Sequence, residues 1–340
     1  MGQMILNELS QLIRELEGRK VLLVCGNSFD RLVISGPILE LNPVQFRQFS
    51  PNPVYEDVCK GVELFRRENC DAILAIGGGS AMDVAKCIKL FSKMDDGENY
   101  LKQEFADTGI LLAAIPTTAG TGSESTRHAV IYYRGEKQSV SHTSIVPQIA
   151  CLIPEVLEGL PVYQKKCTLL DALGQAIESW WSVSATEESI GYSRKAIELI
   201  RDNWKTYIET GERAAEILLA ANYSGRAINI TATTAAHAMS YKLTGLYGIP
   251  HGHAVGLCLP EVWEEMESEE KLQPVFSAFP VDLAWVRNLL EELEMQRPAA
   301  VNREQELEIL ADSVNPLRLK NNPVALSRET LKAMYERILR

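Results

Sequence analysis

Short apolar runs alternate with helix-periodic segments over about the first 150 residues, and no other feature restricts the fold as much. The run Val21-Leu22-Leu23-Val24 is continuously apolar and leads into the turn-forming Cys25-Gly26-Asn27-Ser28. Residues 54–69 place their apolar side chains at helical spacing, and residues 71–76 are apolar again. Strand, helix and strand in this order form a parallel sheet covered by helices. The pattern therefore predicts an α/β domain in the N-terminal part.

In the N-terminal half, an amphipathic helix precedes the first strand. The remaining elements expected there are strands near 44–49 and at 110–115 and a helix at 81–92.

The C-terminal half follows a different pattern. Beyond Pro154 and Pro161, three long segments are helix-periodic, at 164–182, 186–209 and 213–238. No strand run of comparable quality follows them. We therefore expect an α/β domain over 1–153 and an all-helical domain over 154–340.

Charge and cysteine content exclude several classes of protein. The 34 Lys and Arg against 45 Asp and Glu give a net charge of −11 and no basic block, which disfavours nucleic acid as a partner. No apolar run reaches the roughly 18–20 residues that span a bilayer, so we expect a cytoplasmic protein without a membrane partner. The seven cysteines contain no CxxC pair and are expected to be buried free thiols rather than disulfides or a zinc ribbon.

A glycine-rich turn follows one of the expected strands. In the sequence AIGGGSAMD, at 75–83, an apolar strand leads directly into a helix, so backbone N–H groups can approach a phosphate. The spacing is not GxGxxG. The next strand ends in PTTAGTGSE, at 116–124, which is rich in hydroxyl side chains. Two such turns at one sheet edge favour a dinucleotide ligand. The alternative is that the first is a tight turn without a ligand and the second a loop whose hydroxyl groups hydrogen-bond to its own backbone.

Histidines and a carboxylate form a second candidate site. Three of the five histidines, His237, His251 and His253, fall within seventeen residues, and His237 is expected to end a helix. Asp171 and Gln175 are four residues apart and so share one face of a helix. One carboxylate and two imidazoles suit a divalent cation, Zn²⁺ or Fe²⁺, with a position left for a substrate oxygen. The alternative is that each histidine is structural and Asp171 caps a helix.

Four segments carry a family pattern. AIGGGSAMDVAK, IPTTAGTGSESTRHAVI, DALGQAIESWWS and AAHAMSYKLTGLYGIPHGHAVGLCLP resemble, in this order, the signature segments of the iron-containing (group III) alcohol dehydrogenases. The resemblance covers about residues 21 to 260. It implies an α/β dinucleotide-binding domain followed by an all-helical metal and substrate domain, the fold shared with dehydroquinate synthase. It also implies an NAD(P)-dependent oxidoreductase with a divalent metal.

The resemblance assigns roles to particular residues. It implies that the pyrophosphate is held by Gly77, Gly78, Gly79 and Ser80, and that the rest of the cofactor is lined by Asp83, Thr117, Thr118 and Ser123. It implies that the metal ligands are Asp171, Gln175, His237 and His251. Two positions depart from the family pattern, since Gln175 replaces a usual histidine and Tyr241 replaces the second histidine of HAxxH. A neutral glutamine oxygen is a weaker ligand, so metal binding is kept, weakened or lost.

Within the family, DALGQAIESWWSVSATEES and TATTAAHAMSYKLTG look most like the phosphonoacetaldehyde reductase branch, which makes 2-hydroxyethylphosphonate. Basic groups near the motifs would then meet the phosphonate, and the candidates are Arg127, Arg226, Lys242 and His253. Solvated or structural ion pairs are the alternative for each. A general short-chain alcohol dehydrogenase is the alternative for the whole protein.

The expected reaction is reversible hydride transfer between NAD(P)H and a small aldehyde, with the metal polarising the carbonyl. His253 is the candidate proton relay and Tyr241 a weaker one. Arg47, Gln48 and Ser50 follow the second strand without an acidic residue, which allows NADPH. The rivals are a metal-free nucleotide-binding homologue and a lyase or cyclase of the dehydroquinate-synthase type. We also expect a homodimer.

Overall fold

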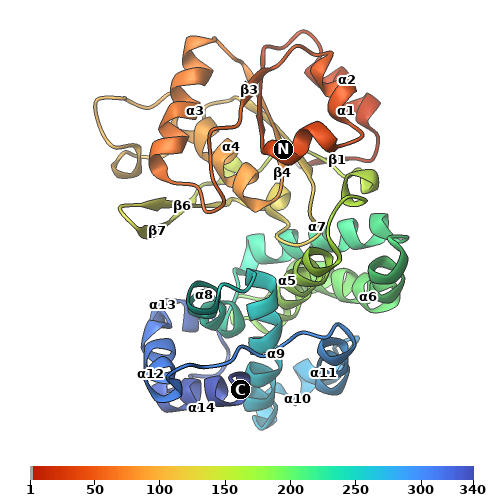
Figure 1. The fold of residues 1–340 in the computed structure, drawn as a ribbon, viewed down its shortest axis with the longest axis vertical. Coiled ribbons are helices and arrows are strands. Elements are labelled where there is room, and N and C mark those ends of the chain that lie inside the picture. Colours follow the sequence, from red (N-terminus) through yellow and green to blue (C-terminus); the bar gives the residue numbers. More distant parts are fainter. Residues whose placement is uncertain (1–2) are drawn as a thin grey trace. The chain divides into compact units, whose positions relative to one another are not determined.

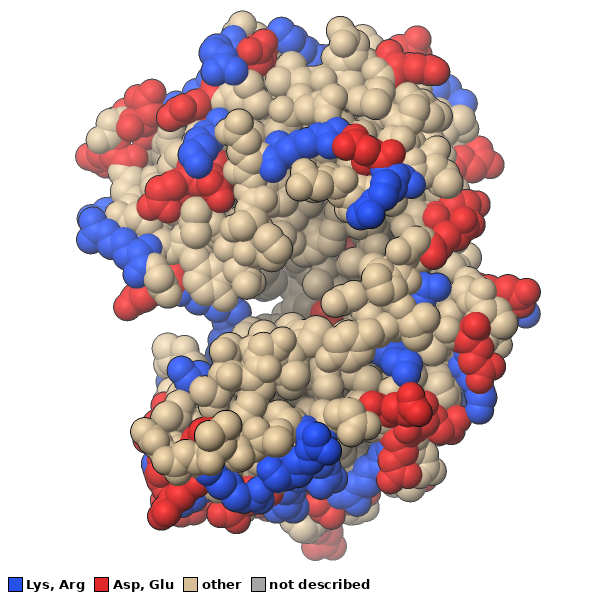
Figure 2. Space-filling model, viewed as in Figure 1, with Lys and Arg blue, Asp and Glu red and all other residues tan. Residues whose placement is uncertain are grey.

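The computed structural model describes residues 3–340 and contains two compact units, which divide between Gly159 and Leu160 (Figure 1). The sequence placed the boundary near 153, just before the short helical turn Pro154–Leu157. On the face drawn in Figure 2, basic and acidic side chains alternate over both units. Among residues 3–340, no helix is long and apolar enough to cross a membrane.

A six-stranded parallel sheet forms the N-terminal unit, in the order β1-β8-β5-β4-β2-β3. Its strands are β1 Met4–Leu6, β2 Val21–Cys25, β3 Val44–Phe46, β4 Ala72–Gly77, β5 Leu111–Pro116 and β8 Ile149–Cys151. Its helices are α1 Leu9–Leu16, α2 Ser35–Leu39, α3 Tyr55–Arg67 and α4 Gly79–Phe91. Every residue of β2 and β4 is buried, which explains their unbroken apolar sequences, since helices cover both faces of such a sheet. The predicted α/β class is confirmed.

Four strands were not predicted from the sequence. β1 and β8 have only three residues each. The antiparallel ribbon of β6 His128–Tyr133 and β7 Glu136–Ser141 is only partly buried, and its strand β6 packs against α4 and α3. Its apolar alternation is weak, as in a sheet with one solvated face. Short strands of this kind depend on their neighbours for stability, so their own sequences carry little signal.

Helices alone make up the described part of the C-terminal unit. Their bounds are α5 Val162–Trp181, α6 Glu187–Thr210, α7 Ala214–Thr231, α8 Ala235–Tyr247, α9 His251–Glu267, α10 Gln273–Ser277, α11 Leu283–Glu292, α12 Arg303–Ser313, α13 Pro316–Leu319 and α14 Arg328–Ile338. The long helix α5 packs against α6, α7 and α9. It is buried almost throughout its second half, which gives this helix the central position in the unit. The predicted all-helical class is confirmed.

The segment 213–238 is not one helix, and this corrects the sequence prediction. α7 ends at Thr231, Ala232 has φ +59°, and α8 begins at Ala235. A left-handed residue cannot continue an α-helix. His237 therefore lies in the first turn of α8 rather than at the end of a helix, and its own backbone N–H is one of the groups that the helix leaves without an internal partner.

Candidate functional site

Asp171, His237 and His251 converge in the C-terminal unit. Asp171 lies in the middle of α5, His237 in the first turn of α8, and His251 is the first residue of α9. One ligand atom from each lies within 4.8 Å of the others, and Asp171 Oδ1 is 3.4 Å from His237 Nε2 and 3.8 Å from His251 Nε2. Asp171 and His237 are 4% and 3% exposed. Three residues that are far apart in the sequence thus form one buried cluster.

Close packing of α9 on α5 brings His251 to Asp171. A Cβ atom on Gly252 would lie 1.9 Å from the Cys167 carbonyl oxygen, so only glycine allows the two helices to approach this closely. The glycine that follows His251 in the sequence is thus required by packing.

The cluster fits a metal ion. Asp171 Oδ1 and His237 Nε2 are buried and have no hydrogen-bond partner among residues 3–340. Leaving a buried polar atom unsatisfied costs about 1–3 kcal/mol, more for a charged group. A carboxylate and two imidazoles are ligands that Zn²⁺ and Fe²⁺ accept, and a cation there would satisfy both atoms.

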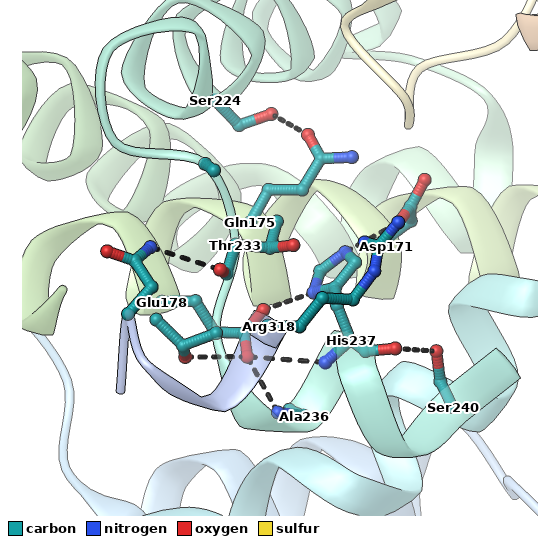
Figure 3. A network of polar contacts seen from close by, with 12 residues as sticks. Asp171, Gln175, Glu178, Ser224, Thr233, Ala236, His237, Ser240 and Arg318 are labelled. Carbon is teal, nitrogen blue, oxygen red and sulfur yellow. Dashed lines mark hydrogen bonds and ion pairs between the residues drawn. The ribbon is translucent and has the colours of Figure 1, made fainter. Parts of the chain in front are cut away.

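Glu178 fixes the orientation of His237, and the sequence analysis did not single it out. Its fully buried carboxylate accepts hydrogen bonds from Thr234 Oγ1 (2.8 Å), Ala236 N (2.7 Å) and His237 N (3.2 Å), and it contacts His237 Nδ1 (Figure 3). The Nδ1–H therefore donates to Glu178, and Nε2 faces Asp171. Burial opposes a charged imidazole, but Glu178 and Asp171 outweigh it and raise the pKa of His237 to about 9. The same negative field attracts a cation.

Ser240 performs a comparable role for His251. The Ser240 hydroxyl donates to the His237 carbonyl at 2.8 Å, and His251 Nδ1 lies 3.2 Å from the same hydroxyl oxygen. Since the hydroxyl has one proton, His251 Nδ1 carries the hydrogen of this contact. In the neutral imidazole, His251 Nε2 is then the unprotonated nitrogen, and it is the one that faces Asp171.

Gln175 lies one helical turn after Asp171 and is buried. Its Oε1 is 3.1 Å from Ser224 Oγ, which also lies 2.8 Å from the Ala221 carbonyl oxygen (Figure 3). The single Ser224 proton can serve only one of these acceptors, and the carbonyl is the closer. A reversed amide would donate from Nε2 to Ser224 and leave Oε1 for the cluster. With the Ser224 proton on the Ala221 carbonyl, Gln175 keeps a hydrogen bond to Ser224 only in the reversed orientation.

Tyr241 and Arg318 lie beside His251. The Tyr241 ring stacks on the His251 ring with centroids 5.2 Å apart and planes at 13°. Arg318, from α13, places its guanidinium carbon 4.7 Å from the Tyr241 ring centroid and donates from Nη1 to the Tyr241 hydroxyl at 2.9 Å. Figure 3 draws Arg318 in the same region as Asp171 and His237. Its position in a segment without motifs gave no sequence signal.

His253 is not part of the cluster. Its Nε2 donates to the Gln296 carbonyl at 2.9 Å, and its Nδ1 accepts from the Tyr163 hydroxyl at 2.8 Å. Burial lowers the pKa of this imidazole. Two residues after His251 on α9, the side chain leaves the helix about 200° around the axis. Both ring nitrogens are thus engaged away from the cluster.

The three basic residues predicted for the substrate come from different elements. Arg226 donates to Asn222 Oδ1 at 3.0 Å and lies over the Tyr192 ring. Lys242 is exposed on α8, and Arg127 belongs to the N-terminal unit.

In the N-terminal unit, the two polar turns lie side by side. β4 and β5 are neighbours with Gly77 opposite Pro116, and Thr117 N donates to the Gly77 carbonyl at 3.0 Å. A Cβ on Gly77 would lie 2.6 Å from Ala81 Cβ, and one on Gly78 would touch the Thr118 side chain at 3.4 Å. The start of α4, with Gly79 and Ser80, therefore forms a single edge with the hydroxyl-rich loop.

A buried lysine ties these turns together. Lys86 Nζ donates to Ser123 Oγ (2.9 Å), Thr126 Oγ1 (2.9 Å) and the His128 carbonyl (2.8 Å), and Ser123 Oγ donates to Asp83 Oδ1 at 3.3 Å. Burial lowers the pKa of Lys86 to about 8 and raises that of Asp83 to about 6. Ser123, expected to line a cofactor, is itself buried and bonded to Lys86.

After β3, Arg47 has an acidic partner that the sequence analysis did not foresee. Its Nη1 and Nη2 atoms bond Asp30 at 2.6 and 2.7 Å, and its guanidinium lies 5.5 Å from the Phe29 ring centroid. The adjacent parallel strands β2 and β3 bring the two side chains together. Arg47 is thus already neutralised.

Two family models together match nearly the whole chain. The model described as "Iron-containing alcohol dehydrogenase" matches residues 1–154, and "Fe-containing alcohol dehydrogenase family, C-terminal" matches residues 166–339.

Among curated relatives, alcohol dehydrogenase 4 of Schizosaccharomyces pombe is 30% identical over 314 residues, which cover 84% of this chain and 73% of the relative. The probable alcohol dehydrogenase EutG of Escherichia coli is 35% identical over 222 residues, covering 62% of this chain but only 55% of EutG. Among solved structures, a sulfoacetaldehyde reductase from Bifidobacterium kashiwanohense in complex with NAD+ has a TM-score of 0.89 at 25% identity, covering 99% of this chain and 96% of that one. An iron-containing alcohol dehydrogenase from Thermotoga maritima has a TM-score of 0.86 at 29% identity, covering 99% and 98%.

Proposed function

The chain belongs to the iron-containing alcohol dehydrogenase family, a family of oxidoreductases that act on alcohols, and we propose that it is a metal-dependent, NAD(P)H-linked reductase of a small aldehyde. One observation carries this proposal above the others. The buried atoms Asp171 Oδ1 and His237 Nε2 lack partners, while Glu178 and Ser240 orient the two imidazoles toward the same point. A divalent metal held there, iron or zinc, supplies a Lewis acid that polarises a carbonyl oxygen.

Four side chains would hold the metal. Asp171, His237 and His251 supply the converging atoms, and Gln175 would add its amide oxygen in the orientation that leaves Nε2 bonded to Ser224. Ser224 thereby makes a glutamine acceptable where a histidine is usual, since it satisfies the half of the amide that does not face the metal.

The N-terminal turns would bind the dinucleotide, which supplies the hydride. Backbone N–H groups at Gly78, Gly79 and Ser80 begin α4, where a helix N-terminus favours the pyrophosphate. Thr117 and Thr118 flank this turn, and Lys86 fixes the loop behind them. The Arg47–Asp30 ion pair leaves the 2′-phosphate without a free cation at this position, so we propose NADH or NADPH without a strong preference.

Reduction of the aldehyde also needs a proton on the new alkoxide. Tyr241 is better placed than His253 to pass it, because its ring stacks on His251 while both nitrogens of His253 are engaged elsewhere.

We propose phosphonoacetaldehyde as the substrate and 2-hydroxyethylphosphonate as the product. The segments around Asp171 and His237 resemble that branch of the family. The similar Bifidobacterium enzyme is named for sulfoacetaldehyde, which is also a two-carbon aldehyde with a tetrahedral acidic group.

Anaerobic assays of NADH and NADPH oxidation, with Fe²⁺ or Zn²⁺ supplied, would test this proposal. Phosphonoacetaldehyde, acetaldehyde and butyraldehyde would be compared at equal concentrations, together with the bound metal content. Strong preference for phosphonoacetaldehyde is the expected result. Equal rates with plain aldehydes would favour a general alcohol dehydrogenase. Absence of both turnover and bound metal would favour the metal-free homologue. We also propose a homodimer, which light scattering would test.

A further inference from the structure

This inference rests on the reduction of an acidic aldehyde proposed above. We propose that Arg318 binds the acidic group of the substrate and that Tyr241 positions the Arg318 guanidinium. Of the cations expected from sequence, Arg226 already donates to Asn222, Lys242 is exposed, and Arg127 belongs to the N-terminal unit. Arg318 is the basic side chain that the structure places against the residues next to the metal ligands.

Three planar groups connect the cluster to this cation. His251 directs Nε2 toward Asp171, the Tyr241 ring stacks on His251, and the guanidinium of Arg318 lies over the Tyr241 ring. The bond from Arg318 Nη1 to the Tyr241 hydroxyl uses one of five N–H donors and fixes the plane of the guanidinium. Several donors are therefore available in a fixed direction for the paired oxygens of a phosphonate or sulfonate.

Arg318 also lacks a counter-charge. Its guanidinium is half-buried, and none of the ion pairs found among residues 3–340 includes it. Two other arginines of the C-terminal helices are neutralised, since Arg328 pairs with Asp312 and Glu308, and Arg337 pairs with Glu261. In a chain of net charge −11, an unneutralised and partly desolvated arginine is suited to an anionic ligand.

The spacing selects a short substrate. The separations of 5.2 Å between the His251 and Tyr241 rings and 4.7 Å between the Tyr241 ring and the guanidinium carbon place that carbon at most about 10 Å from the His251 ring centroid. A single methylene group separates the carbonyl from the acidic group in phosphonoacetaldehyde and in sulfoacetaldehyde. A molecule of this length fits within that upper limit, whereas an acid on a much longer chain would extend past Arg318.

Two substitutions and a matched control test this assignment. Arg318→Met keeps much of the side-chain volume without the charge. Arg318→Lys keeps the charge without the paired N–H donors of the planar guanidinium. Arg194→Met is the control, because Arg194 also stacks on an aromatic ring, that of Trp180 at 4.8 Å. We expect R318M to lower kcat/KM for phosphonoacetaldehyde about 100-fold, mainly through KM, and R318K to recover part of the loss. The rate with butyraldehyde should change less than about threefold, and R194M should change neither.

Sulfoacetaldehyde in the same assay distinguishes the two acids, because a dianionic phosphonate should lose more than a monoanionic sulfonate. Calorimetric binding of methylphosphonate to the wild type and to R318M tests the cation without any turnover. If R318M kept the wild-type preference and bound methylphosphonate equally well, the assignment of Arg318 would be wrong. If the wild type preferred butyraldehyde but bound methylphosphonate through Arg318, the proposed substrate would be wrong and the anion site would stand. Thermal unfolding of R318M checks that the fold is kept.

Discussion

Two buried polar clusters of the protein differ in how completely they satisfy themselves. In the N-terminal unit, Lys86 is wholly buried, and its ammonium meets three oxygens, those of Ser123, Thr126 and His128. In the C-terminal unit, Asp171 Oδ1 and His237 Nε2 are also inaccessible and lie 3.4 Å from each other, but neither has a hydrogen-bond partner among the described residues. The first cluster holds two loops in place, and the second leaves atoms for a ligand. Burial alone therefore does not identify a site, whereas buried atoms that lack partners and also converge with a third ligand, as here with His251, do.

Replacement of His237 by alanine should have the largest effect, because it removes one of the two unsatisfied atoms. We expect the protein to lose most bound metal and turnover to fall by roughly three orders of magnitude, since the metal supplies several kcal/mol of transition-state stabilisation. Metal analysis by mass spectrometry and steady-state assays would measure both. His142→Ala, a histidine of the N-terminal unit that bonds Ser144, is the control. Intact metal and turnover in H237A would remove the basis for the metal site.

Replacement of Glu178 by glutamine sharpens the comparison, because it weakens the contact to His237 Nδ1, the ring nitrogen that already has a partner. The amide keeps the shape of the carboxylate but weakens the hold on the Nδ1 hydrogen. We expect metal affinity to fall about 10–100-fold, as is usual for groups that orient a ligand. Competition with a chromogenic chelator measures this affinity. An unchanged affinity would mean that Glu178 serves only to cap α8 through Ala236 and His237.

Replacement of Lys86 by methionine tests the closed cluster. The change leaves buried oxygens without a donor, so we expect a loss of about 1–3 kcal/mol in unfolding free energy, measured by denaturant titration. KM for the nucleotide should rise, because the loop 116–124 loses its anchor, while bound metal should stay unchanged. A loss of metal in K86M would show that the two clusters are not independent. Lys60→Met, which removes an exposed ion pair with Asp57, is the control.

Replacement of Gln175 by histidine should have the smallest effect and the opposite sign. An imidazole is a better ligand for Zn²⁺ or Fe²⁺ than a neutral amide oxygen, so metal affinity should rise by about tenfold. The same chelator competition measures it. Weaker binding in Q175H would indicate that the Ser224 hydroxyl and the pocket around it fit only the amide.

Much of the fold could be predicted because its signals are local. Continuous apolar runs identified β2, β4 and β5, and helical spacing identified α3 and α5. The four-residue step from Asp171 to Gln175 places both on one face of a single helix. Glu178, three residues further, shares that face, so the spacing could have revealed it as well.

Features that depend on tertiary contacts could not be predicted from the sequence. The break at Ala232 follows an apolar, helix-forming sequence, and it is held by Glu178, whose carboxylate meets Thr234 and the first N–H groups of α8. The role of His253 depended on which residues pack against its side of α9. These are Tyr163 and Gln296, which bond both ring nitrogens of His253. Local periodicity contains neither fact.

The sequence by itself determined the α/β and helical classes, the glycine turn at the end of β4 and the set of residues able to hold a metal, since these follow from periodicity and residue chemistry over a few turns. Only the tertiary structure decided which of them meet. It left Asp171 and His237 with open atoms, satisfied Lys86, engaged His253 elsewhere and brought Arg318 onto Tyr241. The physical reason is that a polar group's partners come from other helices and loops, and their distances are set by packing rather than by spacing in the chain.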